Sequence, residues 1–240
     1  MTEALRELGL RNPLAIWRAA SNFVRTIWDP TRSDIQHGIN VLVQRGLREA
    51  PPGAVQELEE ARPALAEMFR SGYDPELDPA RLALLPEGTL GREWVRFVRA
   101  NDIHPLETLL ALGTPSTTLE YLFRRAYKLH DLMHVVLGAD ASVLGEVRIV
   151  SYSLGQTDLP DTSRVRAPAM ALAVLFMNIG LRRPHEIRPA IRLADTWMKL
   201  GERSPWHVTF RVEEWLERPL AEVRAAMMVD APAIETGLAA

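Results

Sequence analysis

Hydrophobic positions along the chain recur mainly at the three- and four-residue spacings of α-helices. Residues 12–28, NPLAIWRAASNFVRTIW, begin with Asn12 as an N-cap and Pro13 at the first helical position. A second helix follows the break at DPTR and ends at the Pro-Pro-Gly of 51–53. We therefore expect residues 1–50 to form a semi-independent helical hairpin.

The rest of the chain predicts further helices separated by turn-forming residues. Residues 54–71 are helical in composition, with Pro63 forcing a kink or a restart, and 90–99 form another helix. Only HVTFRV, residues 207–212, alternates like a strand, and it is too short and isolated to pair. The pattern predicts an all-α fold, a single multi-helix domain spanning 1–240.

The longest apolar run is APAMALAVLFMNIGL, Ala167–Leu181. It is shorter than the roughly 20 residues that a membrane-spanning helix needs, and Asn178 and Gly180 interrupt it. A core helix is the ordinary interpretation, and a membrane-leaning or lipid-lining helix is the alternative. The alternative draws on basic flanks that suit anionic headgroups, namely Arg164, Arg166, Arg182 and Arg183.

Composition narrows the classes of function. A chain of 240 residues, 47% of them hydrophobic, can bury a core without a structural metal, so any metal is expected to be functional. The net charge of −3 gives no global basic field for nucleic acid. The absence of cysteine excludes disulfides and thiolate zinc sites and leaves imidazole and carboxylate as ligands. The N-terminus has neither signal-peptide nor transit-peptide character, which predicts a cytoplasmic protein.

Two histidines stand one helical turn apart in YKLHDLMHVVLGADASVLGEV, residues 127–147. Projected on a helix, His130 and His134 share an apolar stripe, and this spacing lets two imidazoles chelate one ion. Asp131 lies about 100° round the helix, where it can join as a ligand or orient a histidine. The stripe also contains Leu119, Leu122, Phe123, Ala126, Met133 and Leu137.

A carboxylate follows on the next predicted helix. Gly138 ends the first helix and Ser142 can cap the second. Glu146 is on the inner face of that second helix, where burial without a partner would be costly. The neighbours of Glu146 on that face are Val143, Val147 and Val150.

These residues predict a metal site between two consecutive antiparallel helices. Its ligands would be His130, His134 and Glu146, with Asp131 as the candidate fourth. The mixed nitrogen and oxygen set suits zinc foremost and also allows iron or manganese. Core histidines paired with acidic neighbours, without a metal, are the alternative.

The remaining candidates have no metal-like spacing. Arg203, in GERSPW, could bind an anion, although a solvated arginine is the simpler interpretation. Surface or loop positions are expected for His37, His104, His185 and His207. Core packing is expected for Trp17, Trp28, Trp94, Trp197 and Trp215.

The motif HDLMHVVLGADASVLGE reads HDxxH, eleven residues, then Glu, and it resembles the metal motif of the Coq4 family of ubiquinone biosynthesis proteins. Four further segments are similar to that family: WDPTRSD in the N-terminal helical pair, LPEGTLGREWVRFVRANDIHP upstream of the motif, QTDLP after the glutamate, and GERSPWHVTFRVEEWLERPLAEVRAAM near the C-terminus. The resemblance covers residues 12–228.

The resemblance implies an all-helical fold with a divalent metal held by His130, Asp131, His134 and Glu146. It implies a protein that binds a prenyl lipid, is peripherally associated with the membrane, and acts on polyprenylated hydroxybenzoates. The implied reaction, of the carboxy-lyase (decarboxylase) type, removes the C1 carboxyl group and is coupled to hydroxylation at that carbon. In a bacterium, the membrane would be the inner, cytoplasmic membrane.

The implied partners are a prenylated quinone precursor, the other ubiquinone biosynthesis enzymes, the membrane surface and a second copy in a homodimer. Val150 and Ser153 stand where relatives carry a lysine and a second acidic residue, which predicts different head-group contacts. A non-catalytic prenyl-lipid-binding scaffold that organises the pathway enzymes is the main alternative. An HD-type phosphohydrolase is weaker, because the chain has no second His–Asp constellation.

Overall fold

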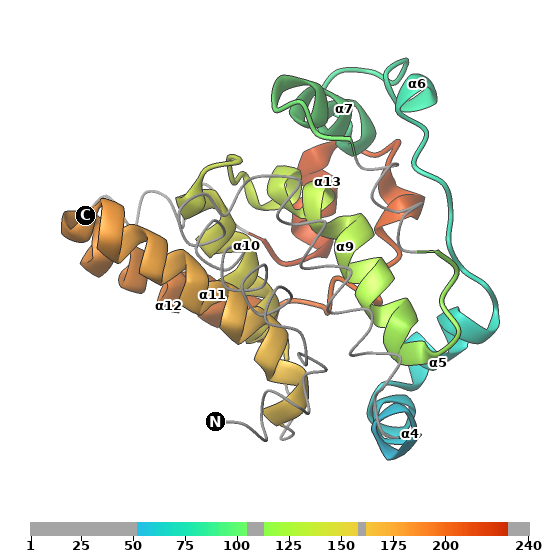
Figure 1. Cartoon of the computed structure of the whole chain (residues 1–240). Helices are drawn as coiled ribbons and strands as arrows, with labels where there is room; N and C mark the ends of the chain where they lie inside the picture. The colour runs from blue at the N-terminus through green and yellow to red at the C-terminus, as the bar shows by residue number, and fades with distance from the viewer. Residues whose placement is uncertain (1–51, 105–112, 158–161, 230–240) are drawn as a thin grey trace, which may run out of the picture.

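The structure, a computed structural model, describes residues 52–104, 113–157 and 162–229 (Figure 1). The predicted hairpin of residues 1–50 lies outside this part of the chain. The elements are α4 (Pro52–Ala61), α5 (Pro63–Arg70), α6 (Pro79–Leu82), α7 (Leu90–Ala100), α9 (Thr118–Leu137), α10 (Val143–Gly155), α11 (Thr162–Arg182), η1 (Pro184–Glu186), α12 (Ile187–Arg203), η2 (Val212–Trp215) and α13 (Leu220–Ala226).

The all-α prediction is confirmed for the described residues. They contain no named strand, and their one isolated β-bridge joins Thr89 to Pro219. Residues 207–212, which alternate like a strand in the sequence, instead form a turn followed by η2. No described helix combines the length and apolar character needed to cross a membrane.

Local sequence signals set the helix ends where they were predicted. Pro63 opens α5 immediately after α4. The hydroxyl of Ser142 accepts a hydrogen bond from the Gly145 N–H (3.2 Å) and caps α10. Gly138 ends α9 in the left-handed conformation, φ 67°, that glycine adopts without a Cβ penalty.

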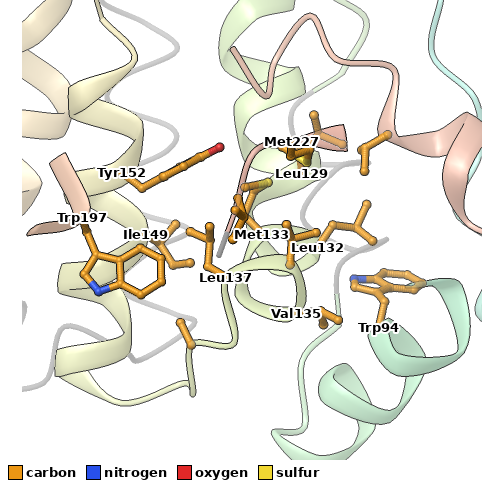
Figure 2. Close-up of a cluster of buried hydrophobic side chains, with 14 of the residues drawn as sticks. Trp94, Leu129, Leu132, Met133, Val135, Leu137, Ile149, Tyr152, Trp197 and Met227 are labelled. Carbon is orange, nitrogen blue, oxygen red and sulfur yellow. The ribbon is translucent and has the colours of Figure 1, made fainter. Parts of the chain in front are cut away.

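Helix α9 runs through the middle of the helical assembly, with α7, α10 and α13 around it (Figure 1). Its Leu129, Leu132 and Leu137 are fully buried. Figure 2 shows these side chains between Trp94 of α7 and Trp197 of α12. Both tryptophans are buried, which confirms their predicted packing role.

The core-facing side of α9 differs from the predicted stripe. Arg125 and Lys128 are buried, whereas several predicted stripe residues are only half-buried. The first half of the helix therefore turns a different side to the core, whereas Met133, His134 and Leu137 in the second half are buried as predicted. The half-buried members are Leu119, Leu122, Phe123, Ala126 and His130.

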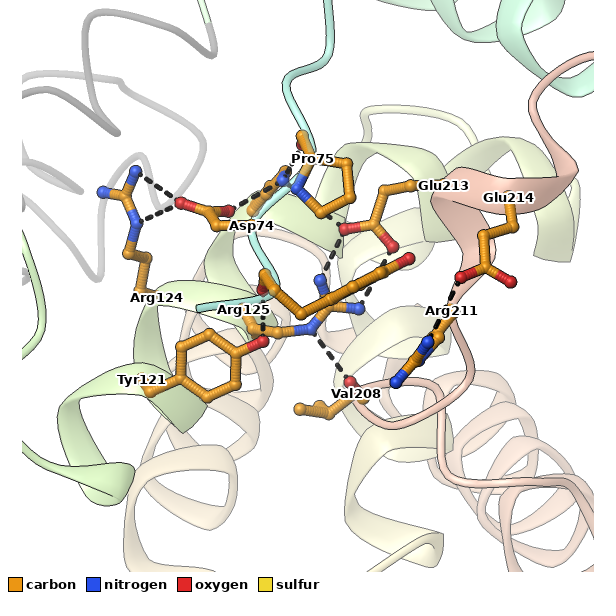
Figure 3. Close-up of polar contacts among 11 residues, drawn as sticks. Asp74, Pro75, Tyr121, Arg124, Arg125, Val208, Arg211, Glu213 and Glu214 are labelled. Carbon is orange, nitrogen blue, oxygen red and sulfur yellow. Dashed lines mark hydrogen bonds and ion pairs between the residues drawn. The ribbon is translucent and has the colours of Figure 1, made fainter. Parts of the chain in front are cut away.

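Two distant carboxylates explain why charged side chains replace apolar ones on this face (Figure 3). Glu213 accepts two hydrogen bonds from the Arg125 guanidinium, at 2.5 and 3.1 Å. Asp74 accepts one from Lys128 at 2.8 Å. Such bidentate and charge-assisted bonds offset the cost of removing the charges from water.

His207 was expected in a surface or loop position, and the expectation of exposure is wrong: the residue is 5% exposed. Its Nδ1 lies 2.5 Å from Oε1 of Gln156, and because an amide oxygen only accepts, Nδ1 carries the proton. Gln156 also donates to the Pro205 carbonyl (2.6 Å), which holds this segment against α10. Burial lowers the pKa of His207 to about 3, with the positive charges of Arg125 and His130 adding to the shift.

Glycines allow α10 and α12 to cross closely. A Cβ atom on Gly201 would lie 2.1 Å from the Tyr152 carbonyl oxygen, and one on Gly155 would lie 2.0 Å from the Met198 carbonyl oxygen. Neither backbone can yield without separating the helices. The crossing therefore requires glycine at both positions.

We expect Gly201→Ala to lower the free energy of unfolding by about 1–3 kcal/mol, as overpacking does in cores. Gly180→Ala is the matched control on α11, because a Cβ there would have nothing within 4 Å. The control should raise the free energy of unfolding by about 1 kcal/mol through helix propensity. Chemical denaturation measures both, and equal effects of the two substitutions would contradict the packing argument.

Candidate metal centre

Three ligand atoms from α9 and α10 converge on one point. The Nε2 atoms of His130 and His134 are 3.2 Å apart. The carboxylate of Glu146 faces both, with Oε2 3.3 Å from His130 Nε2 and Oε1 3.3 Å from His134 Nε2. The structure thus brings together three of the four predicted ligands in a group that could hold a metal ion.

His134 is held in one orientation. Its Nδ1 lies 3.3 Å from the Ala139 carbonyl and 3.1 Å from the Asp140 carbonyl, so Nδ1 carries the proton and donates it. The Nε2 lone pair then points toward the other two members of the His130–His134–Glu146 triad. Phe97 of α7 stacks on the ring, with centroids 5.0 Å apart and planes 20° apart. Backbone acceptors of this kind fix the tautomer of metal-binding histidines.

The separations fit a metal ion. Tetrahedral zinc with ligands at 2.0–2.1 Å places neighbouring ligand atoms about 3.3 Å apart. The Nε2–Nε2 distance of 3.2 Å is close to this value. Three protein ligands leave a position for water or substrate, which is the arrangement of catalytic rather than structural zinc sites.

The electrostatics of the triad show strong coupling between His130 and Glu146. Burial lowers the pKa of His130, but the charge and hydrogen bond of Glu146, together with the Asp131 charge, outweigh burial and raise that pKa to about 9. Burial raises the pKa of Glu146, and the two imidazoles outweigh it and hold the pKa well below its usual range. Without a metal, a proton on His130 therefore neutralises the carboxylate.

Asp131, the fourth predicted ligand, is outside this converging group. Burial raises the pKa of its carboxyl, and the nearby Glu146 charge adds to the shift while the histidines oppose it. Asp131 thus interacts electrostatically with all three triad residues. Its role as a ligand stays a prediction.

The turn between α9 and α10 sets the position of Glu146. A Cβ atom on Gly145 would lie 1.8 Å from the Asp140 carbonyl oxygen, the same oxygen that accepts from His134. Glycine at 145 therefore lets α10 approach close enough for Glu146 to reach the histidines.

Sequence reasoning missed two features of the site. Phe97, which stacks on His134, and the carbonyls of 139–140 were not identified as supports. Phe97 lies in the segment LPEGTLGREWVRFVRANDIHP, whose likeness to the Coq4 family was the one available signal. Backbone carbonyls carry no sequence signal. His104 and His185 have exposed side chains, as expected.

We expect metal binding to release a proton from His130, because a pKa near 9 keeps this histidine protonated at neutral pH. The affinity for zinc should rise about tenfold per pH unit from pH 7 to 8 and level off above about 9. Calorimetry in buffers of different ionisation enthalpy measures the released proton. Glu146→Gln removes the main cause of the raised pKa, so proton release should fall along with affinity.

Comparison with known proteins places the chain in a family. The sequence profile described as "Coenzyme Q (ubiquinone) biosynthesis protein Coq4" matches residues 58–233. A ubiquinone biosynthesis protein COQ4 homolog, mitochondrial, from Rattus norvegicus is 31% identical over 162 residues, covering 65% of this chain and 56% of the rat protein. The chain thus spans little more than half the length of that relative.

Two further proteins extend the likeness. The COQ4 homolog of Homo sapiens is 27% identical over 223 residues, covering 89% of this chain and 77% of the human protein. A crystal structure from Nostoc punctiforme, assigned to ubiquinone biosynthesis, has a TM-score of 0.66 at 21% identity, covering 88% of this chain and 96% of that one. The structural likeness supports the fold, and the matched profile over residues 58–233 shows that this chain belongs to the Coq4 family of ubiquinone biosynthesis proteins.

Proposed function

We propose that this protein is a metal-dependent enzyme of ubiquinone biosynthesis that removes the C1 carboxyl group of a polyprenylated hydroxybenzoate. Membership of the Coq4 family supports the pathway. The observation that carries the proposal is the convergence of His130, His134 and Glu146 on one partly buried point. Such sites, with three protein ligands and an open position, are typical of catalysis.

In the oxidative form of the reaction, the bond between C1 and the carboxyl carbon breaks and a C1–oxygen bond forms. Dioxygen and a two-electron donor are the co-reactants. With two protons they yield the hydroxylated ring, carbon dioxide and water. In the non-oxidative form, a proton replaces the carboxyl group and no oxidant is needed.

The chain's residues have separate tasks in this proposal. His130, His134 and Glu146 would hold the metal, which when bound supplies Lewis-acid polarisation of a phenolate or carboxylate and, if redox-active, electrons for oxygen chemistry. The Ala139 and Asp140 carbonyls orient His134. Phe97 covers one face of that imidazole.

The substrate class has consequences for location. A polyprenyl tail partitions into the bilayer, so the protein would work at a membrane surface, which in a bacterium is the inner, cytoplasmic membrane. The family further suggests assembly with other ubiquinone biosynthesis enzymes and with a second copy of the chain. The alternative function is a prenyl-lipid-binding scaffold without turnover.

We expect His130→Ala and Glu146→Ala each to reduce product formation from a prenylated hydroxybenzoate to below about 1% of wild type. Loss of a residue that only orients a metal ligand typically reduces activity about 10–100-fold, and loss of the ligand itself should reduce it further. Both variants should remain folded and lipid-bound. His104→Ala is the matched control, since that side chain is 63% exposed. Product formation is measured chromatographically with and without oxygen.

Two results would overturn parts of this proposal. Full turnover by the ligand variants would remove the triad from the chemistry. If metal-loaded wild-type protein binds the lipid but never converts it, the scaffold is the function. Oxygen-dependent product with iron or manganese would support the oxidative reaction.

A further inference from the structure

A surface at one end of the α11–α12 pair combines exposed apolar side chains with arginines. We call residues 177–192, the end of α11, η1 and the start of α12, the α11–α12 corner. Among the described residues, five large hydrophobic side chains are exposed, and three of them belong to this corner. They are Met177 (38%), Leu181 (68%) and Ile191 (54%).

The corner is strongly basic for an acidic protein. It contains four arginines and one glutamate, a formal charge of +3, whereas the whole chain carries −3 and the remainder therefore −6. Glu186 pairs with Arg183 at 3.1 Å. Arg188 and Arg192 are exposed, and neither takes part in the ion pairs between described residues of this region.

Two exposed apolar side chains share one face of α11, and an exposed apolar side chain neighbours arginines on α12. Met177 and Leu181 are four residues apart on α11, and Ile191 lies beside Arg188 and Arg192 on α12. The opposite sides of both helices are well packed, since Leu175, Ile179, Ala190 and Ala194 are buried. The exposed apolar groups are therefore an outer surface of a packed pair. Figure 1 shows this end of the pair at the left edge, away from α9.

The chemistry of the corner selects one kind of partner. Nucleic acid would use the arginines, but exposed leucine, isoleucine and methionine have no counterpart on a phosphate backbone. In a two-fold dimer through this surface, the +3 patch of one copy would face the +3 patch of the other, and the two patches would repel each other. An anionic lipid surface can bind both the arginines and the apolar side chains. The arginines contact the headgroups, and the apolar side chains enter the boundary between headgroups and acyl chains.

We propose that the α11–α12 corner is the surface by which this protein docks on anionic membranes. The inference deepens the proposed function by naming where a membrane contact is made. The inference rests on the proposed function for the reason why the protein would need a membrane. Lipid binding by this corner itself requires neither metal nor turnover.

The test is co-sedimentation of the full chain, without metal or substrate, with two kinds of vesicle. One is pure phosphatidylcholine, and the other is phosphatidylcholine with an equal share of phosphatidylglycerol. Wild-type protein should pellet with the anionic vesicles and lose binding as salt rises, because screening weakens surface charge interactions. Arg188→Gln with Arg192→Gln should weaken binding about 25-fold, at roughly fivefold per arginine near an anionic surface.

The apolar contribution has its own variant and matched control. Leu181→Glu with Ile191→Glu should abolish binding, whereas Leu84→Glu, at an 86% exposed leucine outside the corner, should leave it unchanged. All these positions are exposed, so melting temperatures should stay at the wild-type value. Undiminished binding by the corner variants, or an equal loss in the Leu84 control, would overturn the inference.

Two other outcomes would also overturn it. Equal binding to both kinds of vesicle would show that the arginines do not select the surface. A wild-type dimer that the Leu181→Glu and Ile191→Glu pair dissociates would identify the corner as an interface between copies. Because the assay contains no substrate, failure here leaves the proposed reaction intact, and failure of turnover leaves the docking result intact.

Discussion

A partly buried carboxylate that must meet two imidazoles is the constraint around which α9 and α10 are arranged. Glu146 can lie between His130 and His134 only if the two helices approach closely at the short turn 138–142. The left-handed Gly138 and the absence of a side chain at Gly145 allow that approach. The Asp140 carbonyl, which Gly145 accommodates, also orients His134. The backbone conformation of the turn 138–142 therefore sets both the approach of the two helices and the orientation of His134.

The other side of α9 is held by charge rather than by apolar packing. Arg125 and Lys128 reach Glu213 and Asp74, which lie far from them in sequence (Figure 3). These bonds fix the segments around 74 and 213 against the helix that carries both histidines. Removal of Glu213 would leave the buried Arg125 guanidinium without its carboxylate, and an unpaired buried charge of this kind costs about 3–5 kcal/mol. A rigid α9 keeps the imidazole spacing of the triad constant.

Local rules predicted much of this arrangement. Proline, serine and glycine signals located the ends of α5, α9 and α10, because capping and left-handed geometry depend on neighbouring residues only. The triad could be identified from the sequence because its residues also lie close together along the chain. His130 and His134 are one helical turn apart, and Glu146 follows on the next helix. The α9 face was predicted less well, since periodicity treats Arg125 and Lys128 as surface residues and cannot foresee their distant acidic partners.

Long-range contacts account for the remaining differences. His207 was expected at the surface or in a loop because it has no metal-like spacing, whereas its burial depends on a hydrogen bond to Gln156, 51 positions away. Phe97 and the carbonyls of 139–140 support His134 through contacts that exist only after folding. The residues that support His134 are thus brought to it by tertiary folding, whereas the candidate ligands lie close together in the sequence.

The central claim is that His130, His134 and Glu146 together bind one metal ion. X-ray absorption spectroscopy of the zinc-loaded protein tests it most directly. We predict one ion per chain with two imidazole nitrogens and carboxylate oxygen among about four ligands at 2.0–2.1 Å, and loss of this signal in His134→Ala. Zinc held without imidazole, or the same spectrum in His134→Ala, would contradict it.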